Sequence, residues 1–206
     1  MTPEEKYRRI LSNHLPAEAV DGVYDYLYRH KVHFHITRGR LSKLGDYHWP
    51  HKGHEFHEIS VNGDLNTYYF LWVFLHEAAH LETHLKYSSV QPHGHEWQEE
   101  YRRLLIVNTR LFPAELQPLL AQYTHRIPLS HPVAKQIEAL LHHYDADYNP
   151  NALTLDALRP GDRFRLVKQP KLLFEAVERR RTRWLCREVS SNRQYLVSGS
   201  AEVTLS

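Results

Sequence analysis

One apolar stretch decides how this chain is interpreted: Tyr68-Tyr69-Phe70-Leu71-Trp72-Val73-Phe74-Leu75-His76-Glu77-Ala78-Ala79-His80-Leu81. It contains no Pro and no Gly, and its composition is typical of a helix buried on several sides. On a helix, His76 and His80 lie on one face with Cβ atoms roughly 5–6 Å apart. Two imidazoles at this spacing can share one zinc ion, and Glu77 can reach a water molecule held there. The stretch therefore predicts a hydrolytic zinc site.

The same motif has a simpler interpretation, in which both histidines are hydrogen-bonded core residues and Glu77 is a charge on the helix surface. The apolar residues before the motif favour the metal site, because a buried helix holds ligands rigidly. We therefore expect His76 and His80 to be zinc ligands and Glu77 to be the catalytic base.

A catalytic zinc ion usually has three protein ligands and one position for water. Three further histidines compete for the third place: His93, His84 and His95. His93 follows a predicted loop at residues 88–92, so it can point back toward the first helix, and Gly94 lets the backbone approach closely. His84 is less suitable, because three ligands from one straight helix spread too far apart for a tetrahedral site. His95 is a candidate for contact with the ligands or the substrate.

Two segments resemble the motifs of the SprT-like zinc metallopeptidases: Leu75-His76-Glu77-Ala78-Ala79-His80-Leu81 and Pro92-His93-Gly94-His95-Glu96-Trp97. The similarity covers about residues 15–110, including residues 43–47 and 57–62 upstream. It implies a gluzincin-like metallopeptidase with one Zn2+ per chain on His76, His80 and His93, and with Glu77 as the base. It also implies a protein or peptide substrate and a link to DNA, because the best-known eukaryotic members cut proteins crosslinked to DNA.

The sequence departs from that family in its cysteine content. Many members carry a four-cysteine zinc ribbon after the catalytic part, whereas Cys186 is the only cysteine here. Such a ribbon cannot form, so one expected DNA-contacting element is missing.

Further residues near the motifs are candidates for contacts with the zinc ligands or with the substrate: His95, Trp97 and Tyr101. Hydrolysis also needs a donor to the developing oxyanion, and the candidates are Tyr101, Tyr87 and the histidines of a turn-rich stretch. That stretch contains His48, His51, His54 and His57. A solvated loop is its simplest interpretation, and the alternatives are a second metal site or a rim over the first.

The hydrophobic periodicity of the first two thirds of the chain predicts an α+β fold. Helices are expected at residues 3–13, 16–30, 66–87, 93–107 and 132–143, and strands at residues 31–37, 44–49 and 57–61. We expect a zincin-like catalytic domain at residues 1–147, with helices packed on a small three-stranded sheet. Pro113 and Pro118 are expected to interrupt helical structure between the last two helices.

The composition changes after a predicted linker at residues 145–151. Five short strand patterns follow at residues 162–167, 172–177, 182–189, 194–197 and 202–205. They predict a small all-β, barrel-like module at residues 152–206, an open barrel of the SH3-like kind or similar. Residues 151–206 carry 11 Lys and Arg against 6 Asp and Glu, so this module is basic.

One basic run of the module combines arginines with an aromatic residue: Arg179, Arg180, Arg181, Arg183 and Trp184. Such a cluster can bind a nucleic-acid backbone and stack a base, so these residues are candidate nucleic-acid contacts. The simpler interpretation is a solvated hairpin tip, and a module of this kind can equally bind a protein.

Composition restricts the location of the protein. No apolar run approaches the roughly 18–20 residues that span a bilayer, and the N-terminus lacks the apolar core of a signal peptide. We expect a cytoplasmic protein with no membrane partner, and the oligomeric state stays open.

Three hypotheses for the function follow. The first is zinc-dependent hydrolysis of peptide bonds by a metal-activated water, on substrates that include DNA-associated proteins. The second is a non-catalytic, metal-containing module that binds nucleic acid or protein through its basic C-terminal part. The third is a zinc hydrolase that acts on a bond other than the peptide bond.

Overall fold

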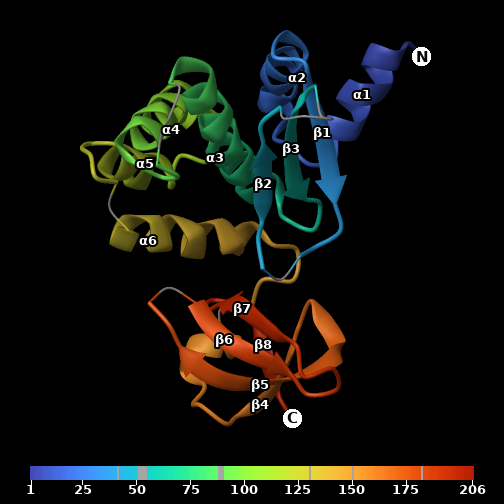
Figure 1. Ribbon diagram of the computed structural model, residues 1–206, viewed down its shortest axis with the longest axis vertical. Helices are drawn as coiled ribbons and strands as arrows, with labels where there is room; N and C mark the ends of the chain where they lie inside the picture. Colours follow the sequence, from blue (N-terminus) through green and yellow to red (C-terminus); the bar gives the residue numbers. More distant parts are fainter. Residues whose placement is uncertain (41, 51–54, 88–90, 130, 150, 182) are drawn as a thin grey trace. The chain divides into compact units, whose positions relative to one another are not determined.

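The computed structural model describes residues 1–40, 42–50, 55–87, 91–129, 131–149, 151–181 and 183–206 (Figure 1). The described residues form six α-helices, a three-stranded sheet and a separate five-stranded antiparallel sheet, which confirms the α+β class. The chain divides into two compact units, one of Met1–Arg40 and Leu44–Tyr148 and the other of Leu41–Lys43 and Asn149–Ser206. The division after Tyr148 lies within the segment predicted to be a linker.

The sheet of the first unit has the strand order β1-β3-β2. Its strands are β1 (Val32–Thr37), β2 (Gly45–His48) and β3 (His57–Asn62), close to the three predicted ranges. The pairing of β1 with β3 is parallel, and that of β2 with β3 is antiparallel. Ile59 and Val61 of the central strand are fully buried, as alternation along a half-buried strand requires. In the order β1-β3-β2, β2 is an edge strand of the described sheet.

The helices of the first unit are α1 (Pro3–Ser12), α2 (Val20–Arg29), α3 (Thr67–Lys86), α4 (His95–Asn108), α5 (Gln117–Tyr123) and α6 (His131–Leu141). Short 3-10 helices lie at Ala17–Ala19, Thr109–Leu111 and His142–Tyr144. The predicted helix at residues 16–30 is thus split between a 3-10 turn and α2. None of the helices in the described residues is long and apolar enough to cross a membrane.

α3 is the central element of the first unit. The side chain of Asn66 caps its N-terminus by accepting a hydrogen bond from the Tyr69 amide at 3.0 Å. The helix contacts β2 and β3 as well as α4, as Figure 1 shows. Its apolar residues are therefore buried almost all round, including Phe70, Leu71 and Phe74. Such burial makes α3 a rigid support for any side chain that it carries.

Two helix boundaries differ from the predictions. The predicted helix from residue 93 begins instead at His95, because Gly94 is the residue that precedes the helix in extended conformation. The interruption predicted at Pro113 is present, since this residue lies between the 3-10 helix that ends at Leu111 and α5, whereas Pro118 lies in the first turn of α5. Proline is well tolerated there, since the amide that it lacks has no partner within the helix.

The second unit contains β4 (Arg163–Leu166), β5 (Gln169–Arg179), β6 (Arg183–Glu188), β7 (Gln194–Ser198) and β8 (Val203–Leu205), with a 3-10 helix at Leu155–Ala157. The strand order is β7-β6-β5-β4-β8, and every pairing is antiparallel. The five predicted strands are present around a core that includes Phe164, Phe174 and Cys186.

The all-β character of this module is confirmed, but its described strands form an antiparallel sheet that does not close into a barrel. β7 and β8 are its two edges, and they pair with β6 and β4. Between β7 and β8, the carbonyls of Gly199 and Ala201 accept hydrogen bonds from the amides of Asp156 and Leu155, at 2.8 and 2.9 Å. The 3-10 helix thus binds the backbone carbonyls of the segment that joins β7 to β8.

Candidate metal centre

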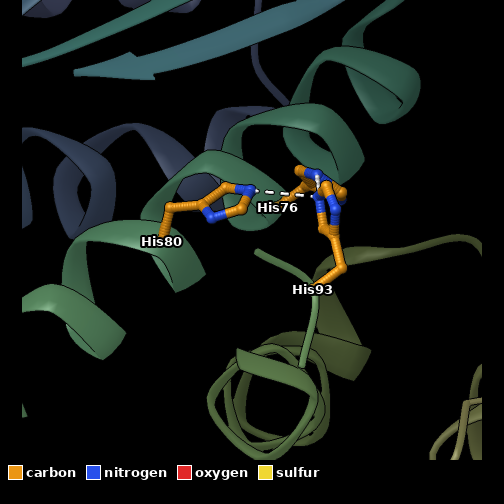
Figure 2. Close-up of side chains that lie close together, drawn as sticks. All are labelled: His76, His80 and His93. Carbon is orange, nitrogen blue, oxygen red and sulfur yellow. Dashed lines mark hydrogen bonds between the residues drawn. The ribbon is translucent and has the colours of Figure 1, made fainter. Parts of the chain in front are cut away.

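Three histidines of the first unit converge on one point (Figure 2). The Nε2 atom of His93 lies 3.1 Å from that of His76 and 3.2 Å from that of His80. One ligand atom from each residue lies within 4.8 Å of the others. α3 supplies His76 and His80, and the segment just before α4 supplies His93. In the described part of the chain this is the only group of at least three such side chains that could hold a metal ion.

The arrangement fits a zinc ion. Two nitrogens bound to one tetrahedral zinc ion at about 2.0–2.1 Å lie about 3.3 Å apart. The two distances to His93, 3.1 and 3.2 Å, are close to this value. Imidazole ligands favour zinc over magnesium or calcium, which prefer oxygen ligands. Three protein ligands also leave one position for water, as in catalytic sites.

His93, and neither of its two competitors, is the histidine that joins the pair on α3. His95 points elsewhere, with its Nε2 atom 3.5 Å from a carboxylate oxygen of Glu99. His84 lies one turn beyond His80, and its ring contacts Trp49 and His57. The geometry thus separates the three candidates that the sequence left open.

The backbone of His93 is held in an uncommon conformation, with a φ angle of 59°. The next residue, Gly94, donates its amide to the carbonyl of Gln91 at 2.9 Å. A Cβ atom at Gly94 would lie only 2.9 Å from that oxygen, so glycine is required for this close turn. The side chain of Gln98 donates to the His93 carbonyl at 3.1 Å. These bonds hold a strained residue in place, as is common at functional sites.

The pKa values of all three histidines are lowered, although only His76 and His80 are partly buried by surface area and His93 is exposed. Burial lowers the pKa of His76 well below the ordinary value, and the neighbouring His80 and His93 lower it further. Burial, followed by the effect of His93, lowers the pKa of His80 to about 4. The pKa of His93 is also lowered by burial. A neutral imidazole is the form that binds a metal ion, so the site is ready to bind one at neutral pH.

Two aromatic residues of α4 pack behind the triad. The ring of Trp97 lies 4.6 Å from those of His76 and His93 and 5.3 Å from that of His80, between centroids. Tyr101 lies 5.4 Å from His76 and 4.9 Å from Trp97, and its hydroxyl donates to the Trp72 carbonyl. Both are buried, with exposed fractions of 5% and 1%. They therefore support the histidines from the core side, and Tyr101 is not placed to stabilise an oxyanion.

Glu77 lies on α3 next to His76 and is only 7% exposed. β2 passes directly over it, because a Cβ atom at Gly45 would lie 2.5 Å from the Glu77 Oε1 atom. Any residue with a side chain at position 45 would displace either this carboxylate or the strand. The absence of a side chain at Gly45 is thus what makes room for Glu77.

Tyr47 belongs to the site but was not among the predicted residues. Its ring is parallel to that of His80, with an interplanar angle of 2° and centroids 6.2 Å apart. Its hydroxyl is hydrogen-bonded to Nδ1 of His57 at 2.9 Å. Burial raises the pKa of Tyr47, so the hydroxyl stays protonated, and the tautomer of His57 decides which of the two groups donates. Strand alternation places Tyr47 on the face of Gly45, which is the signal that could have identified it.

The histidine-rich stretch is only partly visible, because His51 and His54 lie outside the described residues, as do residues 88–90 of the predicted loop. His48 is exposed, and its Nε2 atom lies 2.9 Å from an Asp46 carboxylate oxygen. His57 contacts Tyr47 and His84 rather than the triad. Tyr87, another predicted oxyanion donor, lies at the C-terminal end of α3.

The basic run of the second unit does not present a stacking surface. Trp184 is 3% exposed, and its indole nitrogen donates to an Asp156 oxygen at 2.9 Å. Its ring is therefore not available to a base, and its predicted role in nucleic-acid binding is corrected. Arg179 donates twice to the same Asp156 carboxylate, and Arg180 lies 3.7 Å from Glu178. Two of the four arginines are thus paired with acidic residues of the unit, and Arg183 donates to the Ser42 carbonyl, while Arg179, Arg180 and Arg181 are all exposed.

Comparison of this chain with models of protein families, with curated proteins and with solved structures found no match. Its function must therefore be inferred from the geometry and chemistry of the residues themselves.

Proposed function

We propose that this protein is a zinc-dependent peptidase of the SprT-like type, with His76, His80 and His93 as metal ligands and Glu77 as the general base. The observation that carries the proposal is the convergence of three neutral imidazoles on one point, with a carboxylate next to His76 on the same rigid helix. A purely structural metal site would have no use for that carboxylate.

The residues divide the chemistry between them. When bound, a zinc ion would polarise the scissile carbonyl and lower the pKa of the attacking water. The three histidines would hold the ion and leave one position for water. Glu77 accepts the proton of the water and returns it to the leaving amine. Trp97 and Tyr101 keep the core side of the ligands free of solvent.

The edge strand β2 supports a peptide as the substrate. The carbonyl of Leu44 accepts a hydrogen bond from the amide of Asn62 in β3. In an antiparallel pair the direction of the backbone groups alternates, so those of Gly45 and Tyr47 point to the outer edge. An extended peptide could pair with that edge and pass beside Glu77 and His80. This arrangement favours peptide hydrolysis over hydrolysis of another bond.

The test of this proposal is removal and replacement of the metal. We expect purified protein to contain one zinc ion per chain and to cleave an unstructured protein such as casein. A chelator should abolish the cleavage, and one equivalent of zinc should restore it, whereas magnesium should not, because imidazoles bind it poorly. Elemental analysis and a fluorescent-casein assay measure the two properties. Activity that persists in zinc-free protein would contradict the proposal.

Gly45→Ala tests the place of β2 in the site. The added methyl would lie 2.5 Å from the Glu77 Oε1 atom and 2.7 Å from a Val73 methyl, so Glu77 has to move. We expect zinc to remain bound and kcat/KM to fall about 10- to 100-fold, because a displacement of about 1 Å has this effect in catalysis. Gly22→Ala, where a Cβ meets nothing within 4 Å, is the matched control. Equal kcat/KM values for the two variants would show that the space at Gly45 is not needed for catalysis.

The alternative function, a non-catalytic module that binds nucleic acid, rests on the excess of positive charge in residues 151–206. The burial of Trp184 and the pairing of Arg179 with Asp156 weaken it. Association with DNA is compatible with the peptidase as a means of finding substrates. An electrophoretic mobility shift assay across salt concentrations, run beside the cleavage assay, distinguishes the binding module from the peptidase. Tight, steeply salt-dependent binding by a protein that cleaves nothing would favour the module.

A further inference from the structure

Three alternate residues, Gly45 and Tyr47 of β2 and Trp49 just after it, lie along one side of α3. Gly45 lies over Glu77, and the ring of Tyr47 faces that of His80. Trp49, which directly follows β2, stacks on His84 with centroids 6.0 Å apart and an interplanar angle of 13°. This row of residues therefore continues beyond the metal ligands into a pair of rings that the proposed chemistry does not use.

This Trp49–His84 pair is open to solvent. Trp49 is 57% exposed, although it is among the largest apolar side chains of the chain, and His84 is exposed as well. The neighbouring side chains of Tyr47 and His57 are instead partly buried and hydrogen-bonded to each other. The two exposed rings thus form an aromatic surface in direct continuation of the candidate active site.

The edge of β2 determines which part of a substrate would reach this surface. An extended peptide that pairs with the backbone of Gly45 and Tyr47 has side chains directly opposite those of the strand, on the same face. Opposite side chains in neighbouring strands have Cβ atoms about 4.5–5.5 Å apart, within reach of aromatic contact. Residues two apart along a strand are about 6.7 Å from one another. A peptide residue opposite Trp49 therefore lies about two to four positions from one opposite Tyr47 or Gly45.

We propose that the Trp49–His84 pair is a specificity subsite for an aromatic side chain of the substrate, about two to four residues from the scissile bond. The proposal rests on the proposed peptidase function and names the class of substrate that it prefers. An aromatic ring on two stacked rings gains both buried apolar area and the favourable geometry of an aromatic pair. The subsite thus selects for bulky aromatic residues on one side of the cleavage point.

The test is a scan of one phenylalanine through a series of otherwise alanine- and serine-rich peptides that share one cleavable bond. We expect phenylalanine at one position, about two to four residues from that bond, to raise kcat/KM about tenfold over alanine. Trp49→Ala should reduce this ratio to about one, and Trp49→Phe should retain most of it. Tyr28→Ala, which removes an aromatic residue that is 77% exposed on α2, should leave the ratio unchanged.

A binding measurement separates this proposal from that of the peptidase. The same peptides, labelled with a fluorophore, are titrated against zinc-loaded Glu77→Gln protein and followed by fluorescence anisotropy. Tighter binding of the phenylalanine peptide that depends on Trp49 supports the subsite even if no peptide is cleaved. Cleavage or binding that shows no preference at any scanned position overturns the subsite and leaves the peptidase intact. A Trp49-dependent preference for single-stranded oligonucleotides over all peptides would also overturn it.

Discussion

Glu77→Gln is expected to keep one zinc ion per chain and to lower kcat/KM for peptide hydrolysis by about 10²- to 10⁴-fold. The amide has nearly the shape of the carboxylate, so it fills the same buried space under Gly45. It is uncharged, however, and cannot accept the proton of the attacking water. Steady-state kinetics on a quenched fluorescent peptide and elemental analysis of the same sample measure the two properties.

Glu99→Gln is the matched control for this variant. It makes the same chemical change on α4, at a side chain that is 53% exposed and 3.5 Å from His95 rather than from the triad. We expect its activity to stay within about twofold of the wild type, since surface substitutions away from a site have small effects. If Glu77→Gln retained more than about a tenth of the activity, another residue would have to be the proton acceptor.

The proximity of the two histidines on α3 could be predicted from the sequence, because their relation is local. His76 and His80 are one helical turn apart, and the apolar residues before them make the helix itself a secure prediction. Fixed spacing on a helix determines a distance without any knowledge of the rest of the fold. The strands of the first sheet could be predicted for a similar reason, since alternation is also local.

The place of His93 depends on more than spacing. Its positive φ angle and the close turn from Gln91 to Gly94 turn it back toward α3. The sequence suggested Gly94 as a permissive residue, but it did not predict that the helix starts only at His95. The helix boundary and the position of His93 are linked, because α4 begins only at His95 and the extended Gly94 before it leaves the chain free to turn there.

Tyr47 and Trp184 show why the remaining residues were harder to assign. Alternation places Tyr47 on one face of β2, but only the packing of β2 against α3 reveals which face meets His80. Trp184 follows a run of arginines and looks exposed in sequence, yet its strand position turns it into the core of the second unit. Both outcomes depend on contacts between segments distant in the chain, which periodicity does not encode.

His93→Ala is expected to weaken zinc binding by more than about 100-fold, which is the upper range for losing a residue that only supports a ligand. The variant removes one of three Nε2 atoms and leaves two histidines on one helix, too few to complete a tetrahedral site. Peptide hydrolysis should be lost at stoichiometric zinc and return in part at high zinc concentration, as mass action requires. Competition with a chromophoric zinc chelator measures the affinity.

Two neighbouring substitutions make this result specific to His93. His95→Ala removes an exposed imidazole two residues away that contacts Glu99, and His84→Ala removes the one on the next turn of α3. Both variants should bind zinc as tightly as the wild type, because neither ring lies in the triad. A loss of zinc in His95→Ala with unchanged affinity in His93→Ala would transfer the third ligand to His95. Equal affinity in all three variants would mean that the metal is held elsewhere, and the peptidase mechanism would fail with it.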